Sequence, residues 1–179
     1  MPVGSVSKSS VAVLGDHAAL DDAISKLKRR CPIMRTIHKR TGTPSLRNYP
    51  ADFSGLARII VGQQVSASSA AAIWSRLIEA IHPFTPARIL AAEDTDLRTP
   101  GLSAGKIKTL RAMAHAVANR QIVFSKLNAL SDSDIAGTLT NVHGVGPWTA
   151  DIYLLFALRR ADTFPSGDLA LQLAVQSAF

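Results

Sequence analysis

The order of apolar and polar positions predicts helices along almost the whole chain. In residues 53–61 the apolar side chains recur at the 3.6-residue spacing of a helix with one buried face, and Gly62 ends the pattern. Residues 65–81 are rich in alanine and place a large aliphatic side chain at every fourth position from Ile73 onward, which predicts a core helix. Strand patterns are weak throughout, so the expected fold class is all-α.

Start and stop signals mark the other expected helices. A serine, threonine or aspartate stands where the first turn needs an acceptor, and Pro86 and Pro147 stand at first-turn positions. Ser131 and Asp134 resemble a capping box with Asp in place of Glu. These signals predict helices over residues 18–29, 85–92, 103–119, 131–140, 147–158 and 168–178. The turn-rich residues 30–52 are expected to form an extended connector.

Charge adds a polyanionic partner to this picture. The net charge is +7, residues 23–51 hold eight Lys or Arg and no acid, and residues 97–131 hold six and no acid. Such one-signed stretches attract polyanions, although a merely basic surface would have the same composition. Charge alone therefore does not decide between a nucleic-acid partner and a merely basic surface.

Several classes are disfavoured by what the chain lacks. Its single cysteine, Cys31, excludes an intrachain disulfide and a four-cysteine metal or iron–sulfur site. No apolar run reaches the length needed to cross a membrane, about 20 residues. Residues 1–17 have no convincing cleavage site and are expected to be a loose N-terminal arm before a helical domain at 18–179. We therefore expect a protein without a secretion signal, cytoplasmic in a prokaryote or nuclear in a eukaryote.

The most informative segment is a tight hairpin between two helices, followed by a lone carboxylate. The hairpin is His143 to Pro147, in which Gly144 and Gly146 permit a positive φ or a close backbone approach. Free N–H groups at the start of the next helix form an anion site, and DNA phosphate is the anion that suits a basic chain. Asp168 follows after one helix and a short connection, and Asp is also an ordinary helix cap.

At this point the chain resembles the helix-hairpin-helix DNA glycosylases, in particular the 3-methyladenine glycosylase II type. Three segments carry the resemblance: residues 56–74, 101–114 and 139–171. It implies a two-lobed helical fold, with the helix-hairpin-helix at about 132–158, in a compact form without the family's N-terminal β-domain. It also implies that a damaged base is flipped out of double-stranded DNA into a cleft between the lobes.

The resemblance assigns the chemistry to Asp168, as a buried carboxylate that stabilises positive charge on the sugar while the N-glycosidic bond breaks. The implied function is excision of alkylated purines, such as 3-methyladenine and 7-methylguanine, in base excision repair. Trp148 stands where bifunctional relatives have a Schiff-base lysine, so a monofunctional enzyme that uses water is expected. The alternative is a non-catalytic helix-hairpin-helix DNA-binding module.

The remaining site residues follow from the same resemblance. Trp148 and Asp151 are expected at the base pocket, although Trp148 also suits a core position and Asp151 a solvated or salt-bridged one. Gln64 is expected to fill the gap left by the flipped base, or else to be a polar turn residue. The residues expected to contact DNA are Gln64, His143, Gly144, Val145 and Gly146. The main-chain carbonyls of Thr140, Val142 and Val145 are expected to hold a monovalent cation, Na⁺ or K⁺; catalysis requires no cofactor.

Other residues have structural explanations. Gln63 and Ser66 are expected to be caps or backbone partners, Trp74 a core residue, and Lys106 a solvated residue or a phosphate contact. Relatives continue for further helices after the carboxylate, whereas this sequence stops at Phe179. Three explanations are open: the chain is truncated, the lobe is completed in another way, or the activity is impaired. The expected partner is alkylated duplex DNA, bound by a monomer with no membrane contact.

Overall fold

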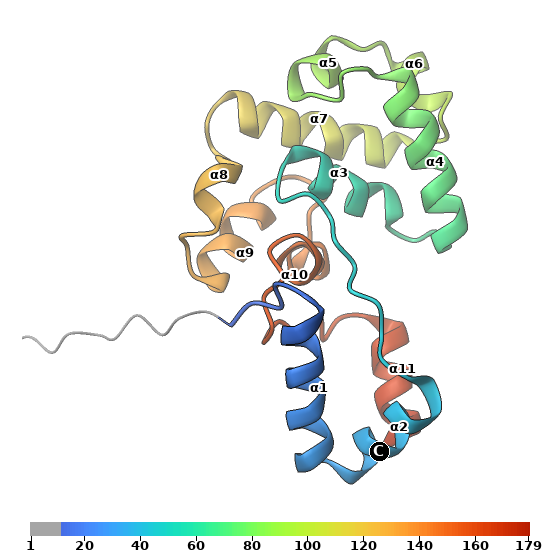
Figure 1. Cartoon of the computed structure of the whole chain (residues 1–179). Coiled ribbons are helices and arrows are strands. Elements are labelled where there is room, and N and C mark those ends of the chain that lie inside the picture. Colours follow the sequence, from blue (N-terminus) through green and yellow to red (C-terminus); the bar gives the residue numbers. More distant parts are fainter. Residues whose placement is uncertain (1–11) are drawn as a thin grey trace, which may run out of the picture.

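The computed structural model describes residues 12–179, and Figure 1 shows the order and arrangement of their helices. In this part of the chain the secondary structure is helical apart from one isolated β-bridge. The helices are α1 (His17–Arg30), α2 (Pro32–Thr41), α3 (Phe53–Gly62), α4 (Ala67–Ala80), α5 (Pro86–Ala91), α6 (Asp94–Arg98), α7 (Ala104–Ala118), α8 (Phe124–Leu127), α9 (Asp132–Thr140), α10 (Pro147–Phe156) and α11 (Leu169–Ala178). The all-α prediction is therefore confirmed for the described residues.

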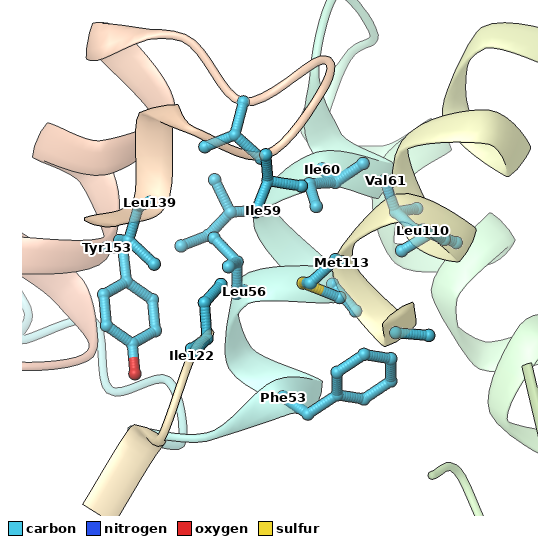
Figure 2. Packing of buried hydrophobic residues seen from close by; sticks show 14 of the residues in the cluster. Phe53, Leu56, Ile59, Ile60, Val61, Leu110, Met113, Ile122, Leu139 and Tyr153 are labelled. Carbon is cyan, nitrogen blue, oxygen red and sulfur yellow. The ribbon is translucent and has the colours of Figure 1, made fainter. Parts of the chain in front are cut away.

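The hydrophobic core is built around α3. Asp52 caps this helix by accepting a hydrogen bond from the Gly55 amide at 3.1 Å. Most of the residues in α3 are buried, so it is enclosed by its neighbours on more than one side. Figure 2 shows Leu110 and Met113 of α7 on one side of it and Leu139 and Tyr153, of α9 and α10, on the other. All core residues outside α1 lie between positions 53 and 158, in the part of the chain that forms α3 to α10.

The second lobe consists of α1, α2 and α11, which lie together at the lower side of the molecule in Figure 1. It has little interior, since Leu20 of α1 is the one buried residue in these three helices. Large apolar side chains of α11 are exposed: Leu169 by 67%, Leu173 by 56% and, just after the helix, Phe179 by 69%. The core that supports the site therefore belongs to the lobe formed by α3 to α10.

One sequence expectation about the helices is wrong. Residues 30–52 do not form an extended connector, because α2 occupies residues 32–41. Pro32 begins this helix, and the Cys31 sulfur accepts a hydrogen bond from the Met34 amide at 3.5 Å, so a proline taken as a turn signal is a helix start. The core helix expected at residues 65–81 is confirmed as α4: Leu77 and the C-cap Ile81 belong to the core and Ile73 packs against it, although the rest of the helix is not buried.

The start of the described chain pairs with the segment after α10. Val13 and Arg160 form an antiparallel bridge, and the Leu14 amide donates to the Arg159 carbonyl at 2.8 Å. Of the expected loose arm, residues 1–11 lie outside the described part, whereas residues 12–14 are held by these hydrogen bonds. No helix in residues 12–179 is long and apolar enough to cross a membrane.

The hairpin between α9 and α10 is held against α7. Gly144 has a φ of +83°, and a Cβ at this position would lie 1.9 Å from the Thr109 hydroxyl oxygen. A residue with a side chain would therefore be strained and would also collide with α7. The expectation for Gly146 is wrong. Its φ is −93°, and a Cβ there would meet no atom within 4 Å.

This contrast gives a prediction about stability. We expect Gly144→Ala to lower the free energy of unfolding by about 2–4 kcal/mol, because it adds backbone strain and an overpacked contact. Gly146→Ala is the matched control and should change it by no more than about 1 kcal/mol, the difference between two helix-cap residues. Urea unfolding of both variants measures the difference, and equal losses would contradict this account of the hairpin.

Candidate active site

The carboxylate of Asp168 is fixed by two hydrogen bonds at the start of α11. Its Oδ1 accepts from the Leu171 amide at 3.0 Å, which makes it the N-cap of the helix. Its Oδ2 accepts from the indole Nε1 of Trp148 at 2.9 Å. Asp168 is thus a helix cap and, through its second oxygen, part of a site with Trp148.

These bonds keep Asp168 ionised. The hydrogen bond from Trp148, and next the one from the Leu171 amide, lower the pKa of Asp168 below its ordinary value because both donors favour the charged form. The expectation of a buried carboxylate is wrong, since Asp168 is only partly buried. Its low pKa therefore comes from hydrogen bonding, which outweighs the small opposing effect of burial.

An aromatic cavity of about 400 Å³ opens on one side of this pair. We define it by its lining residues: Arg47, Tyr49, Arg58, Ile59, Gly62, Val65, Ala67, Ala70, Ala71, Trp148, Ile152, Phe156 and Asp168. They come from the segment before α3, from α3, the following turn and α4, from α10, and from the N-cap of α11. Three aromatic rings in this lining provide flat apolar surface of the kind on which a nucleobase stacks.

A groove runs along the other side of the pair, toward the hairpin. Its lining includes Gln63, Gln64, Lys106, Thr109, His143, Gly144, Gly146, Trp148, Thr149 and Asp168. Within the described part of the chain, Asp168 and Trp148 alone line both hollows. The structure thus joins a cavity of base-like lining to a polar groove at one carboxylate.

The hairpin presents unused amide groups to this groove. In the described part of the chain, the backbone N–H groups of Gly144, Gly146 and Trp148 donate no hydrogen bond to another residue of the protein. They lie around the N-terminus of α10, where the helix dipole favours an anion. His143 is exposed, whereas the Val145 side chain is buried, so Val145 can meet a ligand only through its main chain.

The turn between α3 and α4 forms the opposite wall of the groove. Gln64 is exposed and has a φ of +56°, a left-handed conformation that is uncommon for a residue with a side chain. Gln63 is a structural partner as expected, since its side-chain Nε2 donates to the Gly144 carbonyl at 3.3 Å and to the Thr149 hydroxyl at 2.9 Å. Ser66 caps α4 through its hydroxyl, which accepts from the Ser69 amide at 3.1 Å.

Lys106 also holds this turn. Its ammonium donates to the Val61 carbonyl near the end of α3 at 2.7 Å, so it is not a freely solvated residue, and a phosphate contact through its other N–H donors stays a prediction. Burial lowers the pKa of Lys106, since the charged amine is partly removed from water. The turn that carries Gln64 is therefore attached to α7 by Lys106 and to the hairpin by Gln63.

Asp151 was expected at the base pocket, but the structure does not bring it there. It lines neither the aromatic cavity nor the groove, and no ion pair within 4.0 Å involves it among residues 12–179. Burial raises the pKa of Asp151. A spacing of three positions from Trp148 was not sufficient to bring it to the same cavity, where Ile152 is found instead.

Four charged or aromatic residues of the aromatic cavity were not predicted from the sequence. Arg47, Tyr49 and Arg58 precede or begin the helical segment that resembles the family, and Phe156 was taken as an ordinary helix position. The available signal was the combination of basic and aromatic residues at positions 47–58. Trp74 packs against Phe84, with ring centroids 5.1 Å apart, and lies partly buried beside the core as expected.

Comparison with known proteins agrees with this geometry. Residues 57–179 match the HhH-GPD superfamily base excision DNA repair protein family. The putative DNA-3-methyladenine glycosylase YfjP of Bacillus subtilis is 28% identical over 150 residues, which cover 79% of this chain and 52% of that protein. DNA-3-methyladenine glycosylase 1 of Schizosaccharomyces pombe is 32% identical over 124 residues, 67% of this chain and 54% of that protein.

A solved structure supports the same assignment. The 3-methyladenine DNA glycosylase of Schizosaccharomyces pombe in complex with abasic DNA superposes with a TM-score of 0.80 at 26% identity, over 87% of this chain and 79% of that one. The chain spans about half the length of the two curated relatives. The match to the family over residues 57–179 confirms the resemblance found in the sequence, and the chain belongs to the HhH-GPD superfamily of base excision DNA repair proteins.

Proposed function

We propose that this chain is a monofunctional DNA glycosylase that flips an alkylated purine out of duplex DNA and hydrolyses its N-glycosidic bond. The observation that carries the proposal is the position of Asp168, an ionised carboxylate at the junction of the aromatic cavity and the groove. A nucleotide with its backbone in the groove and its base in the cavity would place the sugar at this junction. The names of the curated relatives support the same substrate class.

The groove suits the DNA backbone. The free amides of Gly144, Gly146 and Trp148 are donors for a phosphate, and main-chain donors of this kind bind DNA without reading its sequence. The exposed Gln64 lies across the groove on a turn that is braced from both sides. We propose that its side chain fills the gap left in the duplex by the flipped base.

The reaction would then proceed by charge stabilisation. The C1′–N bond breaks, the base leaves with the bonding electrons, and positive charge develops on the sugar. The Asp168 carboxylate stabilises that charge, and a water oxygen bonds to C1′ while its proton is released. Trp148 holds the carboxylate in place through the Nε1 hydrogen bond of 2.9 Å, and no lysine of residues 12–179 lines the aromatic cavity to form a Schiff base.

A monovalent cation at the hairpin is a further part of the proposal. The carbonyls of Thr140 and Val145 accept no hydrogen bond in the described chain, and that of Val142 accepts one from the Val145 amide at 3.0 Å. These oxygens belong to one short turn around a common hollow, so they fit a Na⁺ or K⁺ ion. Such an ion would add positive charge beside a bound phosphate. We propose duplex DNA as the partner of a monomeric chain.

Replacing the carboxylate of Asp168 tests the proposed chemistry. We expect Asp168→Asn to reduce the release of free methylated bases from alkylated duplex DNA by at least about 100-fold, the typical effect of losing one such electrostatic group. Asn is also a good helix cap, so the thermal unfolding midpoint should change little. The measurement is chromatography of released bases together with a thermal melt.

Asp16→Asn is the matched control. Asp16 caps α1 in the same way, through a hydrogen bond from the Ala19 amide at 2.8 Å, but lies outside both the cavity and the groove. It should release bases at the wild-type rate. If wild-type protein binds duplex DNA but releases no base, the chain is a non-catalytic binding module and the proposed reaction is wrong.

Removing the indole N–H of Trp148 should change the pH at which Asp168 is charged. Because the indole N–H stabilises the charged form of Asp168, Trp148→Phe should raise the pKa of this carboxyl toward its ordinary value. The carboxylate would then become protonated at a higher pH than in the wild type, and catalysis would be lost at that higher pH. Carbon NMR titration of the aspartate carboxyls measures the change.

Trp74→Phe is the control for this titration, because Trp74 lines neither the aromatic cavity nor the groove. It should leave the Asp168 carboxyl unchanged. An unaltered or lowered pKa of Asp168 in Trp148→Phe would show that the indole does not hold the charge on this group.

A further inference from the structure

Two exposed residues, Gln64 and Val65, lie between two fixed points of the turn from α3 to α4. Gln63, just before them, is held by hydrogen bonds from its Nε2 to the hairpin and to α10. Ser66, just after them, caps α4 by accepting a hydrogen bond from the Ser69 amide at 3.1 Å. The backbone that carries Gln64 and Val65 is therefore fixed on both sides, which restricts where their side chains can lie.

These two adjacent side chains belong to different hollows. Gln64 lines the groove and not the aromatic cavity, whereas Val65 lines the aromatic cavity and not the groove. The chain turns at Gln64, whose φ is +56°. In the proposed complex the DNA backbone lies in the groove and the flipped base in the cavity. The turn would then contact the duplex through Gln64 and the base through Val65.

Val65 has the largest side chain in the part of the cavity lining that comes from this turn and from α4. The other members of that part are small, namely Ala67, Ala70 and Ala71. Val65 is 38% exposed, which is common for a single apolar residue, but its exposed surface borders a hollow that also contains aromatic rings. A flat base has two apolar faces, and an aliphatic side chain can cover the face that a ring does not.

We propose, resting on the base flipping of the proposed function, that Val65 covers the flipped base in the cavity while Gln64 fills the gap that the base leaves. The contact removes apolar surface of both Val65 and the base from water, so it stabilises the flipped state. Because the two residues are adjacent on a turn that is held at both ends, filling of the gap and covering of the base take place together.

The test compares the affinity of the protein for two duplexes. One contains 7-methylguanine on a 2′-fluorinated sugar, which resists cleavage because fluorine disfavours positive charge on the sugar. The other contains tetrahydrofuran, which leaves the same gap but has no base. Val65→Ala should weaken binding of the first duplex about tenfold, the effect of removing two methyl groups from an apolar contact. It should leave binding of the second unchanged.

Two further variants separate this contact from other effects. Gln64→Ala should weaken binding of both duplexes, because both contain a gap. Ile78→Ala is the matched control, since Ile78 is an apolar residue of α4 with almost the same exposure, 39%, and lines neither hollow. It should change neither affinity. All three residues are exposed, so thermal unfolding midpoints should change little.

Equal effects of Val65→Ala on the two duplexes, whether a loss in both or in neither, would overturn the inference. The outcome does not depend on catalysis. If the wild type releases no base from ordinary methylated DNA, the proposed reaction is wrong, but a selective loss in Val65→Ala would still support the contact with the base. A wild-type protein that binds neither duplex would overturn both.

Discussion

The hydrogen bond from the Trp148 indole to Asp168 is the interaction on which the site depends. It joins α10, which belongs to the well-packed lobe, to the N-cap of α11, a helix with no buried residue of its own. The position of the carboxylate is therefore set by a side chain anchored in the core lobe. The same bond keeps the carboxylate charged, so one contact determines both where the negative charge lies and that it is present.

The other parts of the site are attached to the same lobe through polar contacts. Gln63 links the turn that carries Gln64 to the hairpin, and Lys106 links that turn to α7. Gly144 lets the hairpin lie directly against Thr109 of α7. The hairpin, the turn and the carboxylate thus come from segments far apart in sequence and are held in fixed relation around one groove.

The sequence predicted the parts of this arrangement that are encoded locally. Helix starts at Thr85, Ser103 and Ser131 follow from capping chemistry and are found in the structure. The role of Pro32 was missed because proline is both a turn signal and a helix start, and the context that decides between them is tertiary. Asp151 was placed at the pocket by its spacing of three positions from Trp148, but Ile152, four positions on, is the residue that lines the aromatic cavity.

The two arginines that line the aromatic cavity show the limit of prediction from sequence most clearly. Arg47 and Arg58 stack on Phe156 and Tyr49, and the contact between positions 47 and 156 joins distant parts of the chain. No local pattern encodes such a pairing, so the charge of residues 23–51 was interpreted as general attraction for a polyanion. The structure gives part of that charge a specific place, in the aromatic cavity.

We propose above that an ionised Asp168 stabilises positive charge at the sugar of a flipped nucleotide. The most direct test of this proposal is the affinity of the wild-type protein for two duplexes, one with a cationic pyrrolidine and one with a neutral tetrahydrofuran in place of the damaged nucleoside. The pyrrolidine mimics the charge of the transition state, so this account predicts that it binds at least about 100-fold more tightly. Equal affinity for the two duplexes would contradict it.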